Sequence, residues 1–100
     1  MQFEWDENKN KANIKKHSIS FEVSVYVFSD KEAITIYDDE HSLEEQRWVT
    51  IGKIKNTSVI VVIHTYRIRD NYEFIRIISA RKANKKEAKL YFENMGKKAL

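Results

Sequence analysis

The sequence predicts an α+β fold with a short N-terminal strand, two helices, a four-stranded antiparallel meander and a C-terminal helix. Four segments rich in β-branched and aromatic residues follow one another through the middle of the chain, and polar segments separate them. Short connections favour antiparallel neighbours over parallel crossovers. The flanking segments carry helix caps and helical spacing, and we expect the helices to cover one face of the sheet.

The N-terminal segment predicts one strand and one polar helix. Residues 2–5 favour a strand, and Asp6 is a suitable N-cap for a helix that ends near Lys16. The apolar side of this helix is thin, and its main members are Ala12 and Ile14.

The segment from Ser20 to Phe28 carries a divided signal. Ser20 can cap a helix in which Phe21, Val25 and Phe28 share one face. The odd positions from 21 to 27 also alternate as in a strand, and valine and aromatic side chains favour strands. The residue pattern alone leaves both structures open.

The meander strands are expected at residues 33–37, 46–53, 58–65 and 72–80. The third strand is apolar on both faces from Val59 to Ile63, which predicts a central position in the sheet. The polar segment that precedes the fourth strand contains Arg67 and Arg69, and it is expected to form a loop longer than a tight turn.

The C-terminal segment predicts a helix that Asn84 can cap. Beneath a lysine-rich outer face, its packing stripe would comprise Ala88, Tyr91, Phe92 and Met95. Residues 1–95 are expected to form a single domain, and residues 96–100 are expected to fray.

Charge and composition narrow the function. Residues 1–50 hold six basic and eleven acidic residues, a net charge of −5, whereas residues 51–100 hold twelve and four, a net charge of +8. This division suggests one surface for a cationic partner and one for a polyanion, unless the charges interleave in the fold.

Cysteine is absent, and no apolar run approaches the roughly 20 residues that span a bilayer, so we expect a cytoplasmic protein. With two glycines, the chain has no glycine-rich phosphate loop.

The main functional signal is a basic cluster where the last strand meets the last helix. Strand alternation places Glu73, Ile77 and Arg81 on one face, and Arg76 among apolar residues on the other. An arginine in that position either faces a groove at the strand end or pairs with a buried acid.

Several arginines around one phosphate can stabilise the transition state of phosphodiester cleavage without a metal ion. Glu73, or an arginine or lysine with a lowered pKa, could take the proton from a ribose 2′-hydroxyl. The candidate catalytic residues are therefore Arg67, Glu73, Arg76 and Arg81. The candidate RNA-binding residues include Lys82, Lys85, Lys86 and Lys89, although a solvated surface role is the simpler interpretation of each lysine in the helix.

The histidines His17, His41 and His64 lie on separate predicted elements without the spacing of metal ligands, so neither a metal nor another cofactor is expected. His64 ends the buried strand and is interpreted as a hydrogen-bonded structural residue, with a groove-lining role as the alternative. The segment Asp38 to His41 is interpreted as a polar turn.

The segments FEWDENKNKANIKKHSISFEVSVYVFSD, VTIG, VVIHT and IRIISARKANKKE, in this order and spacing, resemble the BrnT family of type II toxins. The resemblance covers about Phe3 to Phe92. It implies a RelE-like α+β fold, a ribonuclease activity that inhibits translation, and neutralisation by a BrnA-type antitoxin whose ribbon-helix-helix end binds operator DNA. It also implies a helix for residues 20–28.

The family motifs transfer to this chain residue by residue, with two departures: Ser18, and a loop between the last two strands that is longer than the usual arginine-rich turn. The N-terminal motif falls on Trp5, Asp6 and Lys9, the KHG motif on Lys16 and His17, and the ISAR motif on residues 78–81. Lys9 thereby becomes a further RNA-binding candidate. Ser18 replaces the glycine of KHG, so the helix would end without the residue that most easily adopts a left-handed cap.

These observations predict a metal-independent endoribonuclease toxin that forms a hetero-oligomer with its antitoxin and reaches operator DNA only through that antitoxin. The alternative is a non-catalytic module that binds the antitoxin and acts in DNA-bound autorepression. The antitoxin could dock on the acidic N-terminal half around Glu44 and Glu45, or it could cover the basic groove with its own acids. The sequence leaves both docking modes open.

Overall fold

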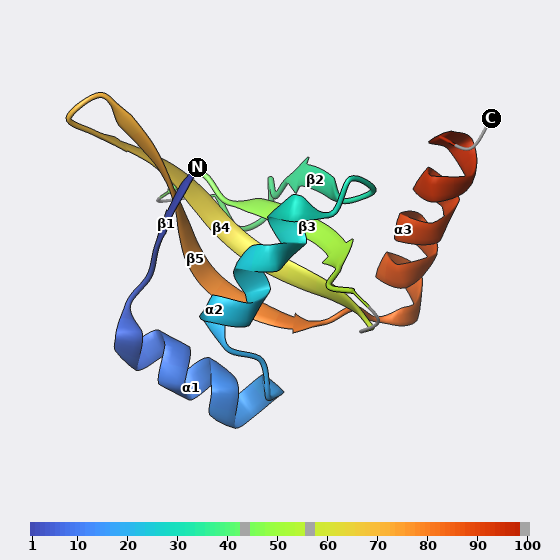
Figure 1. The fold of residues 1–100 in the computed structure, drawn as a ribbon, viewed down its shortest axis with the longest axis horizontal. Helices are drawn as coiled ribbons and strands as arrows, with labels where there is room; N and C mark the ends of the chain where they lie inside the picture. The colour runs from blue at the N-terminus through green and yellow to red at the C-terminus, as the bar shows by residue number, and fades with distance from the viewer. Residues whose placement is uncertain (43–44, 56–57, 99–100) are drawn as a thin grey trace.

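The structure, a computed structural model, describes residues 1–42, 45–55 and 58–98 and confirms the α+β fold class. Five strands form one sheet in the order β1-β5-β4-β3-β2. In Figure 1, α2 lies in front of the sheet, α1 lies below β5, and α3 lies at the end opposite the β4–β5 hairpin tip. The elements are β1 Gln2–Glu4, α1 Glu7–His17, α2 Phe21–Ser24, the 3-10 helix η1 Val25–Ser29, β2 Ile34–Tyr37, β3 Trp48–Lys53, β4 Val59–Arg69, β5 Tyr72–Lys82 and α3 Lys85–Lys98.

The sheet contains one strand more than the predicted meander. Strands β2 to β5 form the antiparallel meander, but β1 pairs with β5 in parallel, with Phe3 opposite Ile75. The sheet is therefore mixed rather than a four-stranded antiparallel meander. The parallel pair was not predicted because it joins segments far apart in the sequence, and pairing over such a separation leaves no local pattern.

The β4–β5 hairpin is longer than predicted. Strand β4 continues through Arg69 and β5 begins at Tyr72, so the expected loop contracts to Asp70 and Asn71. These two residues have φ angles of 50° and 68°. Positive φ at both positions is typical of a type I′ turn, which matches the twist of the flanking strands. Arg67 and Arg69 of the expected loop thus belong to β4.

A β-bulge interrupts β5 at Ile78. On β4, Ile63 and His64 are adjacent, but their partners on β5 are Ser79 and Ile77, so Ile78 has no partner in the register. The predicted alternation along β5 is therefore wrong on one side of the bulge, because every side chain beyond it changes face.

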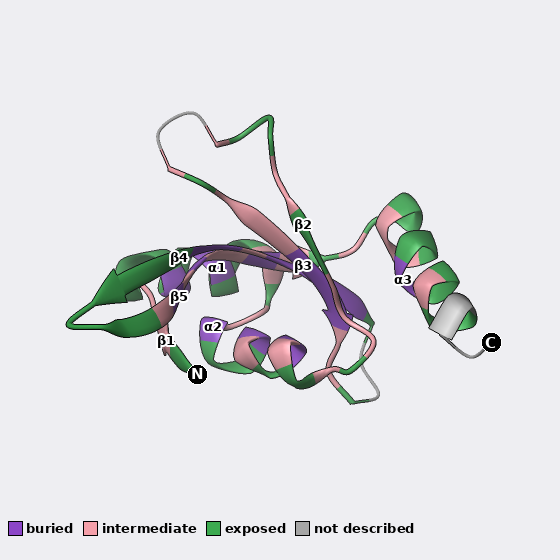
Figure 2. Ribbon diagram, turned by 90° about the horizontal axis from the view of Figure 1, so that it is seen from above, coloured by how far each residue is buried: buried purple, intermediate pink, exposed green. Residues whose placement is uncertain are grey.

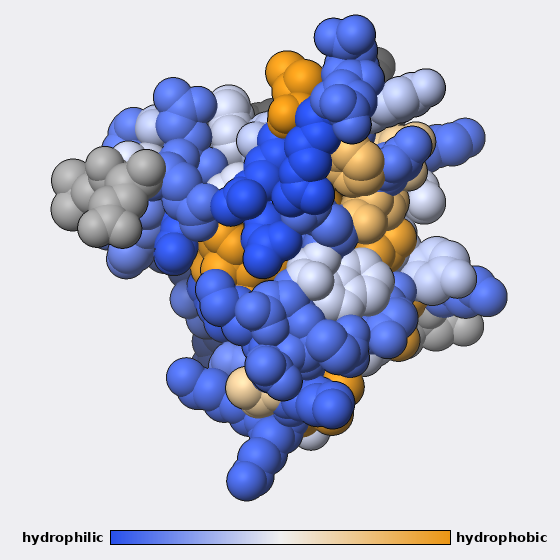
Figure 3. All heavy atoms as spheres, turned by 90° about the vertical axis from the view of Figure 1, so that its left-hand side faces the viewer, coloured by the Kyte–Doolittle hydropathy of each residue, from blue (hydrophilic) through white to orange (hydrophobic). Residues whose placement is uncertain are grey.

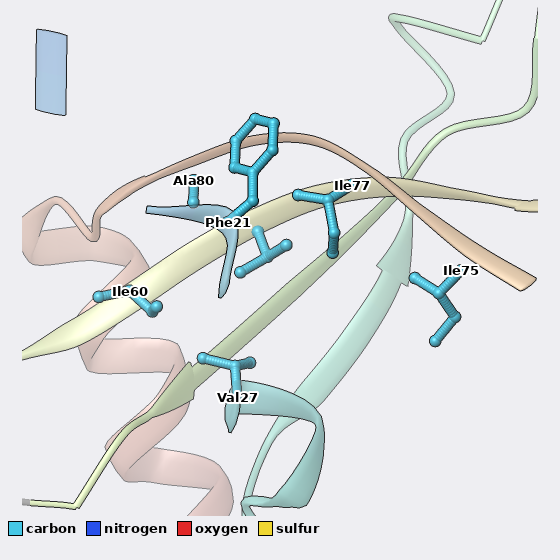
Figure 4. Close-up of a cluster of buried hydrophobic side chains, with 7 residues drawn as sticks. Phe21, Val27, Ile60, Ile75, Ile77 and Ala80 are labelled. Carbon is cyan, nitrogen blue, oxygen red and sulfur yellow. The ribbon is translucent and has the colours of Figure 1, made fainter. Parts of the chain in front are cut away.

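The main core lies between the sheet and the segment formed by α2 and η1 (Figure 2). Figure 4 shows Phe21 and Val27 with the apolar side chains of Ile60, Ile75, Ile77 and Ala80 from β4 and β5. Val62 belongs to the same buried cluster. Ser20 caps this segment through its Oγ, which accepts a hydrogen bond from Val23 N at 3.1 Å. The helical interpretation of residues 20–28 is confirmed, although the helix tightens to 3-10 geometry from Val25.

Helix α1 packs on β5 through polar side chains. Asp6 caps it as predicted, and its carboxylate accepts two backbone hydrogen bonds. Ala12 and Ile14, the expected packing side, are exposed, and the buried residues are Asn10 and Asn13. Buried amides of this kind are stable only when their hydrogen bonds are satisfied. Backbone groups outside the helix satisfy Asn13 and the Oδ1 of Asn10, and the carboxylates of Glu7 and Glu22 accept from Asn10 Nδ2.

Helix α3 packs against the opposite face of the sheet, where Tyr91 contacts Ile51, Val59 and Val61. The expectation that all helices cover one face is therefore wrong for α3. Phe92 and Met95 of the predicted stripe are exposed. Residues 96–98, which were expected to fray, belong to α3, and residues 99–100 lie outside the described range. Among the described residues, no helix is long and apolar enough to cross a membrane.

Ser18 adopts the left-handed conformation that glycine would adopt more easily, with φ 59° and ψ 27°. Its N–H caps α1 by donating to Ile14 O at 2.8 Å. We expect Ser18→Gly to raise the free energy of unfolding by about 1 kcal/mol, because a side chain penalises this conformation. Urea unfolding checks the expectation, and an unchanged or lower midpoint would contradict it.

His64 is fully buried, and its Nε2 lies 2.7 Å from Thr50 Oγ1. Burial lowers the pKa of His64 from 6.5 to about 4. Because the unfolded chain binds the proton more tightly, the contribution of His64 to stability is complete above pH 6.5 and declines as the pH falls towards 4. We expect a loss of about 2 kcal/mol between pH 7 and pH 5. Urea unfolding at both pH values should show this loss in the wild type and in His17→Gln, and much less of it in His64→Gln.

Candidate functional site

The β-bulge at Ile78 brings Arg76 and Arg81 to one face of the sheet, where alternation had separated them. Both pair with odd-numbered residues of β4, and the odd positions of one continuous strand share a face. Arg67 and Arg69 occupy further odd positions of β4. This face is opposite the core that α2 and η1 cover. With the nearby loop residue Arg47, we call it the arginine face: Arg47, Arg67, Arg69, Arg76 and Arg81.

Carboxylates contact every arginine of the arginine face. The nitrogen–oxygen distances are 3.9 Å for Arg47–Glu45, 3.3 Å for Arg67–Glu45, 2.7 Å for Arg69–Glu4, 2.7 Å for Arg76–Glu4 and 2.7 Å for Arg81–Glu87. Five arginines thus share three carboxylates, which leaves these groups with a net charge of +2. The arrangement holds guanidinium groups in place and keeps an excess of positive charge for an anion.

The environment of Arg76 resolves the two possibilities that the sequence left open. Its Nη1 lies 2.7 Å from the largely buried carboxylate of Glu4, so Arg76 pairs with an acid. Glu4 also holds Arg69, and both arginines lie near the hairpin. Figure 3 shows that hydrophilic side chains dominate the end of the molecule where this hairpin lies.

Three buried polar atoms near the arginine face have no hydrogen-bond partner within the described part of the chain. They are Glu4 Oε1, Arg47 Nε and Thr65 Oγ1. Buried polar groups are costly to leave unpaired, so a bound polar group or water is expected to satisfy them. Thr65 and Arg67 together line a pocket of about 340 Å³.

A second pocket, of about 370 Å³, lies at the α3 end of the arginine face. Its polar lining consists of Asp38 and His41 after β2, Arg47 before β3, Arg81 on β5 and Glu87 on α3. Its apolar lining includes isoleucines of the sheet and one leucine of α3. The pocket thus combines two guanidinium groups with an apolar surface.

Glu87 fixes the orientation of Arg81. Its two carboxylate oxygens accept from Arg81 Nη1 at 2.7 Å and from Nη2 at 2.9 Å. This hydrogen bonding holds the pKa of Glu87 below its usual value and raises the pKa of Arg81. Glu87 also forms a reciprocal capping box with Asn84, whose capping role is thereby confirmed. One carboxylate therefore joins the start of α3 to the end of β5.

Two predicted site residues lie on the other face of the sheet. Glu73 pairs with Ile68, an even-numbered residue of β4, and Lys82 pairs with Ile60 of the main core. Lys82 lines a separate pocket next to α1. The structure therefore brings together Arg67, Arg76 and Arg81 but not Glu73 or Lys82.

The other lysine candidates are exposed on helices. Lys9 is exposed on α1. Lys85, Lys86 and Lys89 lie on α3, which begins beside the pocket of Arg81, and Lys89 contacts Glu93 at 3.8 Å. Within the described ranges, no group of three or more histidine, cysteine, aspartate and glutamate residues is arranged to hold a metal ion.

Sequence reasoning missed the pair formed by Asp38 and His41. His41 Nδ1 lies 2.9 Å from Asp38 Oδ2, and both residues line the pocket of Arg81. The signal in the sequence is an aspartate three residues before a histidine, and the segment that contains both was interpreted only as a polar turn. Their position beside Arg81 depends on strand packing that no local pattern reveals.

Comparison with solved structures supports the fold. The structure matches the crystal structure of the Brucella abortus ribonuclease toxin BrnT with a TM-score of 0.63 and 24% sequence identity. The match covers 85% of this chain and 99% of that chain. At this identity the likeness concerns the fold. A search of curated proteins found no match.

A family model describes the sequence itself. The model of the ribonuclease toxin BrnT of type II toxin-antitoxin systems matches residues 5–87. The matched segment begins directly after β1 and includes α1, α2, the meander and the start of α3. The chain therefore belongs to the BrnT family of ribonuclease toxins of type II toxin-antitoxin systems.

Proposed function

We propose that this protein is a metal-independent endoribonuclease that inhibits translation by cleaving RNA at its arginine face. The observation that carries the proposal is the clustering of five arginines on three carboxylates, on the sheet face opposite α2 and η1. Guanidinium groups bind phosphates through paired N–H groups, and fixed positive charge stabilises the charge that develops during phosphodiester cleavage. The family supports the same reaction class.

Arg81 is the arginine best placed for the scissile phosphate. Its guanidinium donates to both oxygens of Glu87 and to Lys82 O, which occupies three of its five N–H groups. The remaining N–H groups, on Nε and Nη2, lie along one edge of the guanidinium and can receive two phosphate oxygens. The 2′-hydroxyl then attacks, and the products carry a 2′,3′-cyclic phosphate and a 5′-hydroxyl.

The other arginines would hold the RNA strand on either side of the cleaved bond. Arg67 and Arg76 extend the positive surface towards the hairpin, and Lys85, Lys86 and Lys89 extend it along α3. The roles of Glu73, Lys9 and Lys82 stay predictions, and the proposed mechanism does not use them. Glu73 and Lys82 lie on the other face of the sheet, and Lys9 belongs to α1.

A type II toxin has an antitoxin partner, and we propose a BrnA-type antitoxin with a ribbon-helix-helix domain that contacts operator DNA in the cytoplasm. Glu45 contacts Arg67 and Arg47, so this acid is part of the arginine face. This pairing favours an antitoxin that covers the arginines with its own acids. Glu44 lies outside the described residues. Glu45→Lys should therefore retain antitoxin binding, and a large loss of affinity would favour docking on the acidic segment instead.

Expression in a bacterium tests the proposed function. The wild type should arrest growth and degrade cellular RNA, whereas the double variant Arg67→Ala and Arg76→Ala should do neither. The matched control is Lys11→Ala with Lys15→Ala, which removes the same charge from exposed positions of α1 and should stay toxic. A wild-type protein that binds antitoxin but leaves growth and RNA intact would support the non-catalytic module.

A further inference from the structure

The proposed cleavage requires a group that accepts the proton of the attacking 2′-hydroxyl. Glu73 lies on the other face of the sheet, whereas His41 lines the pocket of Arg81. Among the described residues, His41 is the one histidine on this side. His17 belongs to α1, and His64 is buried on the α2 side.

Backbone and side-chain hydrogen bonds hold the turn that carries His41. The N–H of Asp38 donates to Arg47 O at 2.9 Å, which closes the base of the loop. Ser42 Oγ donates to Asp38 O and accepts from the N–H of Arg47 at 3.0 Å. These hydrogen bonds join Asp38 and Ser42 to Arg47. Residues 43–44, between Ser42 and Arg47, lie outside the described residues.

Asp38 orients the imidazole of His41. Its two carboxylate oxygens lie 2.9 and 3.2 Å from His41 Nδ1. A carboxylate only accepts hydrogen bonds, so this contact assigns the proton to Nδ1 and leaves Nε2 with its lone pair. The side chain of Asp38 is 18% exposed and that of His41 is 65% exposed. A partly buried acid therefore positions an imidazole that RNA can reach, as in other pairs of a base and its orienting group.

The pocket suits one nucleotide of an RNA strand. Its volume of about 370 Å³ lies within the range of small-ligand sites. Arg47 and Arg81 can contact the phosphate, and the apolar lining, which includes Ile36 and Leu90, can contact the base or the ribose. A nucleotide bound in this way would present its 2′-hydroxyl between His41 and the phosphate.

We propose that His41, oriented by Asp38, is the general base of this ribonuclease, an inference that rests on the proposed function. His41 Nε2 takes the proton of the 2′-hydroxyl while the O2′–P bond forms and the P–O5′ bond breaks. The departing 5′-oxygen takes a proton from solvent, and the imidazolium returns its proton to solvent. Asp38 acts as a positioning residue, because it holds Nδ1 and stabilises the imidazolium.

Cleavage of a defined RNA oligonucleotide by the purified full chain, in EDTA, tests this role. His41→Ala should lower kcat about 100-fold or more. Added imidazole should restore part of the activity, because the missing side chain is exposed to solvent. Asp38→Asn should lower kcat with little change in KM. Its matched control, Asp39→Asn, alters an exposed neighbour in the same turn and should cleave at the wild-type rate.

The outcomes separate this inference from the proposed function. A folded His41→Ala variant that cleaves as fast as the wild type would overturn the role of His41 and leave the ribonuclease intact. Loss without any rescue by imidazole would also overturn it. Rescue of Arg81→Ala by imidazole would do the same, because imidazole cannot replace a guanidinium and the effect would be non-specific. A wild type that cleaves no RNA would overturn the proposed function and this inference with it.

Discussion

Arg81→Ala is expected to lower the rate of RNA cleavage about 100- to 1,000-fold, the usual cost of removing one fixed donor from a developing charge. The substitution removes the guanidinium edge that can face the phosphate. It also leaves the carboxylate of Glu87 in the pocket without its bidentate partner, where it would repel the phosphate. Single-turnover cleavage of an RNA oligonucleotide measures the effect, with thermal unfolding to confirm that the variant is folded.

Two further variants define the cause of that loss. Lys82→Ala removes the same charge from the adjacent residue, which lies on the other face of the sheet, and should change the rate only a few-fold. The cleavage rate of Arg81→Lys should lie between the rates of Arg81→Ala and Lys82→Ala, because lysine keeps the charge but lacks the planar guanidinium group. Equal losses for Arg81→Ala and Lys82→Ala would show that total charge matters and that the face does not.

Asn13→Ala is expected to lower the free energy of unfolding by about 2 to 4 kcal/mol, the largest effect on stability that we predict. Asn13 Nδ2 donates to Ile19 O and Ala80 O, both at 2.8 Å, and its Oδ1 accepts from Ala80 N at 3.1 Å. The side chain thus joins α1 to β5 one residue before Arg81. Alanine would leave these buried backbone groups without partners. Urea unfolding at neutral pH measures the change.

Asn8→Ala is the matched control, because Asn8 lies on the same helix with its side chain exposed. Its effect should stay within about 0.5 kcal/mol. If Asn13→Ala were equally mild, α1 would be held by other contacts and the bridging role of Asn13 would be wrong.

Local patterns predicted most elements of this fold. Asp6, Ser20 and Asn84 cap helices because short polar side chains reach nearby backbone N–H groups, an interaction that lies entirely within a few residues. The apolar run from Val59 to Ile63 forms the central strand β4 for an equally local reason, since a strand covered on both faces must be apolar at every position.

Long-range contacts account for what local patterns missed. The parallel pairing of β1 with β5 depends on residues from the two ends of the domain. Asn10 and Asn13 have the composition of a solvated face, yet they are buried because backbone groups of Phe21 and Ala80 meet their amides. Likewise, nothing near Tyr91 indicates which face of the sheet α3 covers.

The candidate site was predicted in part. The arginines were identified from residue type, because few side chains suit phosphate binding as well. Their grouping depends on the unpaired Ile78, which reverses the alternation and moves Arg76 onto the face of Arg81 while Glu73 moves away. Ile78 stands between Ile77 and Ser79, and no glycine or proline lies beside it to indicate the change of phase.

The end groups of the cleaved RNA test the central claim most directly. An RNA oligonucleotide incubated with the purified protein in EDTA should yield fragments with a 2′,3′-cyclic phosphate and a 5′-hydroxyl, because the 2′-oxygen of the RNA is the nucleophile. Mass spectrometry of the fragments identifies both ends. Intact RNA in EDTA, with cleavage only after magnesium is added and fragments that carry 5′-phosphates, would contradict the account.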